Sequence, residues 1–125
     1  DNRSTIDIDA MIRKTKFEFF TKEVNLSKEQ QNQLFPLYEE MEKTIYKMNR
    51  EAEALMKKTA ADTNASETEF EAAATAMAKT TLQQGEIELD YFNKFSKFLS
   101  KKQLFRLKQA EEKFTQYLLK QRRSK

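Results

Sequence analysis

The side chains of this chain that could do chemistry are carboxylates, amines and thioethers, because the sequence contains no His and no Cys. Nucleophilic catalysis needs a nucleophile beside a base, and phosphate binding commonly uses a glycine-rich loop. Neither pattern occurs. The carboxylates cluster at spacings typical of solvated helix faces: Glu39, Glu40 and Glu42, and Glu86, Glu88 and Asp90. We therefore expect no enzymatic activity, no catalytic residues and no cofactor.

Metal binding is a more specific chemical role to consider as an alternative to catalysis. Zinc, nickel and cobalt sites rely on imidazole or thiolate ligands, which this chain lacks. Met41, Met48 and Met77 could suit Cu(I), but they fall on the apolar seams of two expected helices, which favours core packing. The sequence predicts no transition-metal site and leaves a carboxylate site for a hard cation open.

Charge is unevenly distributed along the 125 residues, although the net charge is only +3. Residues 61–100 carry three basic and seven acidic side chains, whereas residues 101–125 carry nine basic and two acidic ones. A basic segment can meet nucleic acid, acidic lipid or an acidic protein segment. Here the cations spread around an expected helix whose apolar stripe is needed for packing, so we expect no nucleic-acid binding. No apolar run approaches the roughly 18 residues of a membrane span.

One motif occurs twice, as Leu26-Ser27-Lys28-Glu29-Gln30 and as Leu99-Ser100-Lys101-Lys102-Gln103. Both copies have the spacing of a capping box, in which a serine hydroxyl accepts from the backbone N–H three residues on and the glutamine reaches back to the N–H of the serine. Ser66 and Glu69 form a third such pair. We assign an architectural role to six motif residues: Leu26, Ser27, Gln30, Leu99, Ser100 and Gln103.

The doubled motif resembles the LTxxQ signature of the Spy/CpxP group of small helical periplasmic proteins, with Ser in place of Thr in both copies. The stretches 19–27 and 34–40 look most like the branch common in Bacteroidetes. The resemblance spans roughly residues 8–120. It implies a secretory signal upstream of Asp1, a periplasmic location and a thin, curved homodimer.

The resemblance also implies a function. It points to an ATP-independent chaperone that holds unfolded or aggregation-prone proteins during envelope stress. The alternative is a periplasmic sensor that docks on a membrane sensor kinase or an anti-sigma factor, like CpxP-like or metal-sensing relatives. A purely structural helical domain is a third possibility. For client contact we select four residues of the last helix: Phe105, Arg106, Lys108 and Lys113.

These residues must be positioned by helices, since the chain has one Gly and one Pro and is 34% charged. We predict a single all-α domain over 1–125, in which four helices follow a short-long-long-short order. The two long helices form an elongated antiparallel hairpin, and the short ones fold where both L-S-K-x-Q turns meet. The predicted helices span 5–24, 28–59, 66–98 and 101–121.

Apolar residues in the two long helices recur at alternating spacings of four and three, the pattern of a coiled-coil seam. The first seam runs from Leu34 to Leu55. The second comprises Phe70, Ala74, Met77, Thr81, Gln84, Glu88, Tyr91, Phe95 and Phe98. Pro36 removes one helical hydrogen bond, so we expect a kink near Asn32–Pro36. Gly85, beside polar seam positions, suggests a bend or a close approach between helices.

Overall fold

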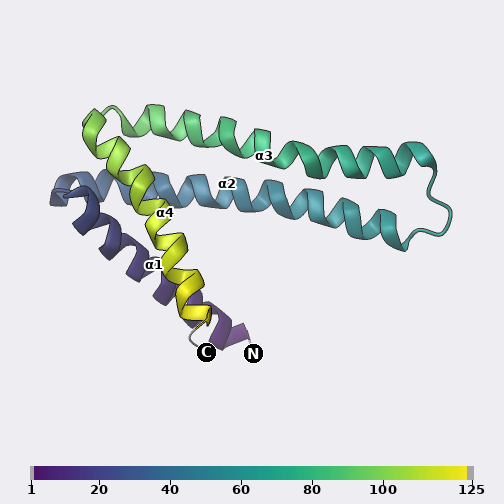
Figure 1. Ribbon diagram of the computed structural model, residues 1–125, viewed down its shortest axis with the longest axis horizontal. Helices are drawn as coiled ribbons and strands as arrows, with labels where there is room; N and C mark the ends of the chain where they lie inside the picture. Colours follow the sequence, from purple (N-terminus) through teal and green to yellow (C-terminus); the bar gives the residue numbers. More distant parts are fainter. Residues whose placement is uncertain (1, 124–125) are drawn as a thin grey trace. The chain divides into compact units, whose positions relative to one another are not determined.

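The computed structural model describes the backbone of residues 2–123 and the side chains of residues 8–122. It contains α1 (Asn2–Val24), α2 (Lys28–Ala61), α3 (Glu67–Phe95) and α4 (Lys101–Arg123), shown in Figure 1. Across this described part there is no strand. The all-α class and the short-long-long-short order are confirmed, with helices of 23, 34, 29 and 23 residues.

The chain divides into two compact units. Unit 1 combines Asp1–Phe35 with Phe95–Lys125, and unit 2 is Pro36–Lys94. The first boundary lies inside α2, directly before Pro36. Proline lacks the N–H that would bond to the carbonyl of Asn32, yet α2 continues through it without a break. Pro36 therefore does not end a helix.

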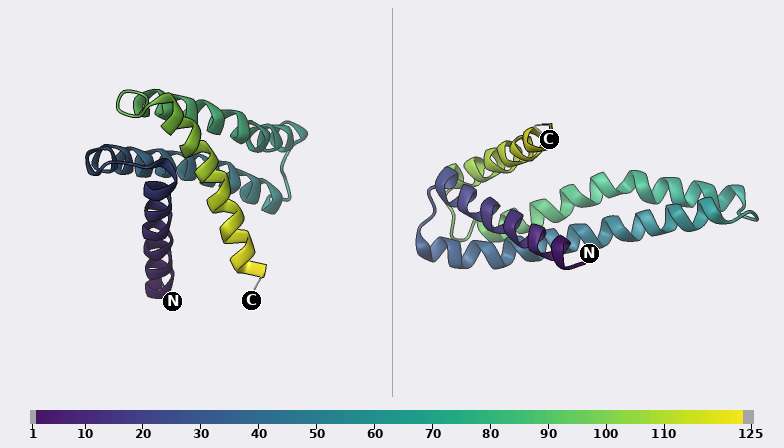
Figure 2. Two further views of the ribbon diagram at one scale, coloured as in Figure 1. Left: turned by 60° about the vertical axis from the view of Figure 1, so that its left-hand side comes forward. Right: turned by 90° about the horizontal axis from the view of Figure 1, so that it is seen from below.

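Unit 2 is an antiparallel helical hairpin, in which the part of α2 from Pro36 onward and α3 run side by side (Figures 1 and 2). In the connecting turn, the N–H of Asn64 donates to Oδ1 of Asp62 at 2.8 Å. The capping box at the start of α3 is formed. The N–H of Glu69 donates to Ser66 Oγ at 3.2 Å, and the N–H of Ser66 donates to Glu69 Oε1 at 3.3 Å.

The seam predicted for the first half of α3 is wrong. Ala73 is buried at 1% exposure, whereas Ala74 and Thr81 are exposed and Phe70 and Met77 retain 47% and 38% exposure. Residues 71–78 contain five alanines, so the apolar pattern there does not single out one helix face. The predicted seam follows the largest side chains, whereas the structure buries the adjacent, smaller Ala73.

Gly85 does not mark a close approach between helices. A Cβ atom built on this residue would meet nothing within 4 Å. The expectation of a helix contact that only glycine permits is therefore wrong. The glycine occupies an ordinary interior position of α3 that alanine would also fit.

Unit 1 is built around α1 and α4, which pack against each other. The start of α1 and the end of α4 lie at the same end of the unit (Figures 1 and 2). Phe20 and Phe114 meet edge to face, with ring centroids 6.5 Å apart, and Phe17 stacks on Phe35 at 4.2 Å. Phe17 and Phe35 are half-buried, whereas Phe20 and Phe114 belong to a buried apolar core that also comprises Val24, Leu26, Leu34, Phe95, Leu99, Leu107 and Ala110.

Candidate functional site

Both L-S-K-x-Q motifs of unit 1 form capping boxes. At α2, the N–H of Gln30 donates to Ser27 Oγ at 3.1 Å, and the N–H of Ser27 donates to Gln30 Oε1 at 3.0 Å. At α4, the equivalent bonds between Gln103 and Ser100 are both 3.0 Å. Each box gives two backbone N–H groups at a helix start the partners that the helix cannot supply.

The two boxes are joined through their glutamines. Nε2 of Gln30 donates to Oε1 of Gln103 at 2.9 Å, and Nε2 of Gln103 donates to Oε1 of Gln30 at 3.0 Å. The two amides thus form a reciprocal pair between residues 73 positions apart. The predicted meeting of the two motif turns is therefore present, and the glutamine side chains make the contact.

Each glutamine also binds the backbone just before the other box. Gln30 Nε2 donates to the carbonyl of Phe98 at 3.0 Å, and Gln103 Nε2 donates to the carbonyl of Asn25 at 3.4 Å. A primary amide offers two N–H donors and two acceptor positions, and here all four are used in both side chains. Glutamate could form the box but could not donate. The tertiary link therefore requires glutamine.

The chain turns tightly before the first box, which exposes the carbonyl that Gln103 reaches. Asn25 directly follows α1 and has a positive φ of 58°, a conformation that asparagine tolerates better than most residues. The N–H groups of Asn25 and Leu26 donate back to the carbonyls of Lys22 and Thr21, which is a Schellman motif. Leu26 and Leu99, at equivalent positions before the two boxes, are 7% and 5% exposed.

The four residues predicted to contact clients lie on α4 and differ in exposure and in their contacts. Phe105 is 64% exposed. Lys113 Nζ lies 3.4 Å from Glu23 Oε2 on α1, and Lys108 Nζ lies 3.5 Å from Oε1 of Glu111 on its own helix. Arg106 is half-buried. Since neighbouring helical residues point about 100° apart, Phe105 and Arg106 face different sides of α4.

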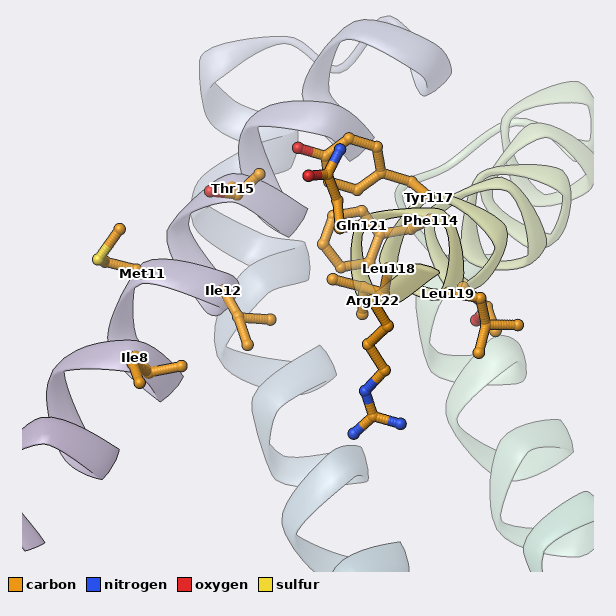
Figure 3. A pocket seen from close by; sticks show the side chains of 11 residues that line it. Ile8, Met11, Ile12, Thr15, Phe114, Tyr117, Leu118, Leu119, Gln121 and Arg122 are labelled. Carbon is orange, nitrogen blue, oxygen red and sulfur yellow. The ribbon is translucent and has the colours of Figure 1, made fainter. Parts of the chain in front are cut away.

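A groove between the first half of α1 and the second half of α4 was not predicted. It has a volume of about 750 Å³ and is mostly apolar (Figure 3). Ile8 and Ile12 line it from α1, and Phe114, Tyr117 and Leu118 line it from α4. Ile8, Met11 and Ile12, the large apolar residues of the first half of α1 whose side chains are described, are 55%, 68% and 37% exposed. We call this feature the α1–α4 groove.

Among the residues whose side chains are described, no three Asp or Glu residues come together in a way that could hold a metal ion. None of the helices, over the same part of the chain, is long and apolar enough to cross a membrane.

Comparisons of the chain with protein-family models, with curated proteins and with solved structures find no match. Membership of the Spy/CpxP group therefore stays a prediction based on the two motifs. The local geometry of those motifs is independent of it, since the capping boxes and the glutamine pair are seen directly in the structure.

Proposed function

We propose that this protein holds unfolded or aggregation-prone proteins without using ATP. The observation that carries the proposal is that large apolar side chains are exposed on a strongly basic helix. On α4, Phe105, Tyr117 and Leu119 are 64%, 46% and 43% exposed. These exposed apolar side chains are available for contact with apolar segments of another chain.

Charge and apolar contact have separate roles in this proposal. The seven basic and two acidic residues of positions 101–122 attract acidic segments of a client at long range. Exposed apolar side chains then contact the apolar segments that an unfolded chain presents. The sequence contains no nucleotide-binding loop, so release depends on the client folding or dissociating rather than on ATP hydrolysis.

The resemblance to the Spy/CpxP group suggests where and in what form the proposed chaperone acts. It favours a periplasmic location, a role in envelope stress and a homodimer. A regulatory protein that binds a membrane sensor kinase or an anti-sigma factor is the competing function, since the same exposed side chains could contact a folded partner.

The proposal is tested by following the aggregation of a denatured model protein by light scattering, with and without a few equivalents of this chain and without ATP. We expect suppression that weakens at high salt, because screening shortens the reach of charges to about 3 Å at 1 M. Absence of suppression at every ratio would contradict the proposal and favour the regulatory function. A basic protein of similar size and no chaperone activity, such as cytochrome c, is the control for charge alone.

A further inference from the structure

The α1–α4 groove begins where the tight packing between these helices ends. Phe19 of α1 and Phe114 of α4 are in contact, with ring centroids 5.8 Å apart. Beyond this pair, toward the start of α1 and the end of α4, Ile8, Ile12 and Tyr117 are exposed and Leu118 is half-buried. Ile8 points toward the groove from α1, and Leu118 lies on the α4 side (Figure 3). These side chains are apolar, like those in the core between two packed helices, but here the space between α1 and α4 is not filled.

The size of the groove limits what could fill it. A volume of about 750 Å³ lies within the roughly 300–1,000 Å³ of typical ligand pockets. It would accept a few apolar side chains rather than the face of a whole domain. Two helices flank it, and an amphipathic helix can place side chains at i, i+3, i+4 and i+7 into such a groove.

The basic residues near the groove favour some amphipathic segments over others. Residues 8–16 of α1 carry three basic side chains and one acidic one, and residues 113–122 of α4 carry three basic side chains and no acidic one. Among them, Arg122 lines the groove itself. A segment with apolar anchors and flanking Asp or Glu would therefore gain both contact and attraction, whereas a segment flanked by Lys would be repelled.

We propose that the α1–α4 groove binds an apolar, acid-flanked segment of a partner protein in helical form. This proposal deepens the proposed function and depends on it, because it names the class of client segment and the place where it binds. Apolar contact supplies affinity in the groove, and the basic residues around it supply the preference for acidic flanks.

The direct test uses two fluorescein-labelled amphipathic peptides with identical apolar residues. One has Glu at the flanking positions and the other has Lys. Fluorescence anisotropy with the full chain should give a Kd at least about tenfold lower for the Glu peptide at low salt, and the difference should shrink at 0.5 M salt. Equal affinity for both peptides, or no binding of the Glu peptide, would overturn the proposal.

Matched variants locate the binding. Ile8→Asn with Met11→Asn changes two residues of the groove that are 55% and 68% exposed, and Leu82→Asn with Leu89→Asn changes two residues of α3 that are 65% and 69% exposed. Because all four side chains are largely exposed, both variants should fold, which circular dichroism can verify. We expect about tenfold weaker binding of the Glu peptide for the first variant and less than twofold for the second. Equal losses in both would overturn the proposal.

The aggregation assay separates this proposal from the proposed function. Suppression of aggregation by a wild-type chain that does not bind the Glu peptide would overturn the groove assignment and leave the proposed function standing.

Sedimentation with vesicles of phosphatidylglycerol and phosphatidylcholine tests whether the groove binds anionic lipid instead of an acidic protein segment. We expect the chain to stay in the supernatant. Sedimentation that Ile8→Asn with Met11→Asn abolishes would overturn the proposal, since the groove would then take lipid.

Discussion

Units 1 and 2 both start helices with capping boxes, but the boxes of unit 1 also make a tertiary contact. Ser66 and Glu69 of unit 2 form a capping box whose bonds join residues three apart. The two boxes of unit 1 have glutamine at the equivalent position, and their bonds extend across 73 residues of sequence. In unit 1, a local cap is also a tertiary contact because its acceptor side chain can donate as well.

The core of unit 1 also contains more large, fully buried apolar side chains than the core of unit 2. In unit 1, Phe20, Leu34, Phe95 and Leu107 are all 0% exposed. Unit 2 buries Tyr38, Met41 and Tyr91, but its other buried apolar residues are Ala52 and Ala73. Since the free energy gained by burial grows with apolar area, unit 1 has more to lose from a single core substitution.

The largest effect should come from a core leucine of unit 1. Leu107→Ala removes a side chain that is 0% exposed and should lower the free energy of unfolding by about 2–5 kcal/mol, through lost burial and a residual cavity. Leu89→Ala makes the same chemical change in unit 2 at 69% exposure and should cost less than about 0.5 kcal/mol. Chemical denaturation measures both. Similar losses would contradict the packing described for unit 1.

The next effect should separate the two kinds of capping box. Gln30→Glu keeps an acceptor for the N–H of Ser27 but removes the donors to Gln103 Oε1 and to the carbonyl of Phe98. We expect a loss of about 1–3 kcal/mol, because polar groups in the partly buried pair lose their partners. The reverse change, Glu69→Gln in the isolated box, should leave stability within about 0.5 kcal/mol. A tolerated Gln30→Glu would show that donation by the amide is dispensable.

Removal of the serine caps should lower the free energy of unfolding by equal and smaller amounts in both units. Ser27→Ala, Ser100→Ala and Ser66→Ala each remove one acceptor for a backbone N–H at a helix start, at a cost of about 1 kcal/mol. Denaturant melts of the three variants check this. No loss for Ser27→Ala and Ser100→Ala would refute the capping-box assignment, and a much larger loss than for Ser66→Ala would show that the serines also support the glutamine pair.

The smallest effect should be stabilising and lies in unit 2. Gly85→Ala places a methyl group where nothing lies within 4 Å, inside the long helix α3. Alanine reduces the backbone entropy lost on folding, so stability should rise by about 0.5–1 kcal/mol. The midpoint of thermal unfolding provides the measurement. A decrease would mean that Gly85 serves a contact or a bend after all.

The sequence predicted features that depend on neighbouring residues better than those that depend on packing. The capping boxes follow from residues three apart, so their spacing was sufficient. The reciprocal bonds between Gln30 and Gln103 depend on where two distant turns lie in space, and only the repetition of glutamine at one motif position hinted at them.

In the first predicted seam, Leu34, Tyr38 and Met41 are buried as expected, whereas Leu55 at its end is 38% exposed, so that part of the prediction is wrong. The second seam was mispredicted where small residues surround the helix, as around Ala73. Ile8 and Ile12 are apolar, but the spacing of residues within one helix does not show whether the opposite helix lies close enough to cover them.

The most direct test of the central claim, that the two glutamines join the motifs of unit 1, is a double-mutant cycle on Gln30→Ala and Gln103→Ala measured by chemical denaturation. Each single variant leaves the partner amide without its reciprocal bonds, whereas the double variant removes both amides. We predict that the double variant loses at least about 1 kcal/mol less stability than the sum of the single losses. Additivity within about 0.5 kcal/mol would contradict the claim, because independent sites add in that way.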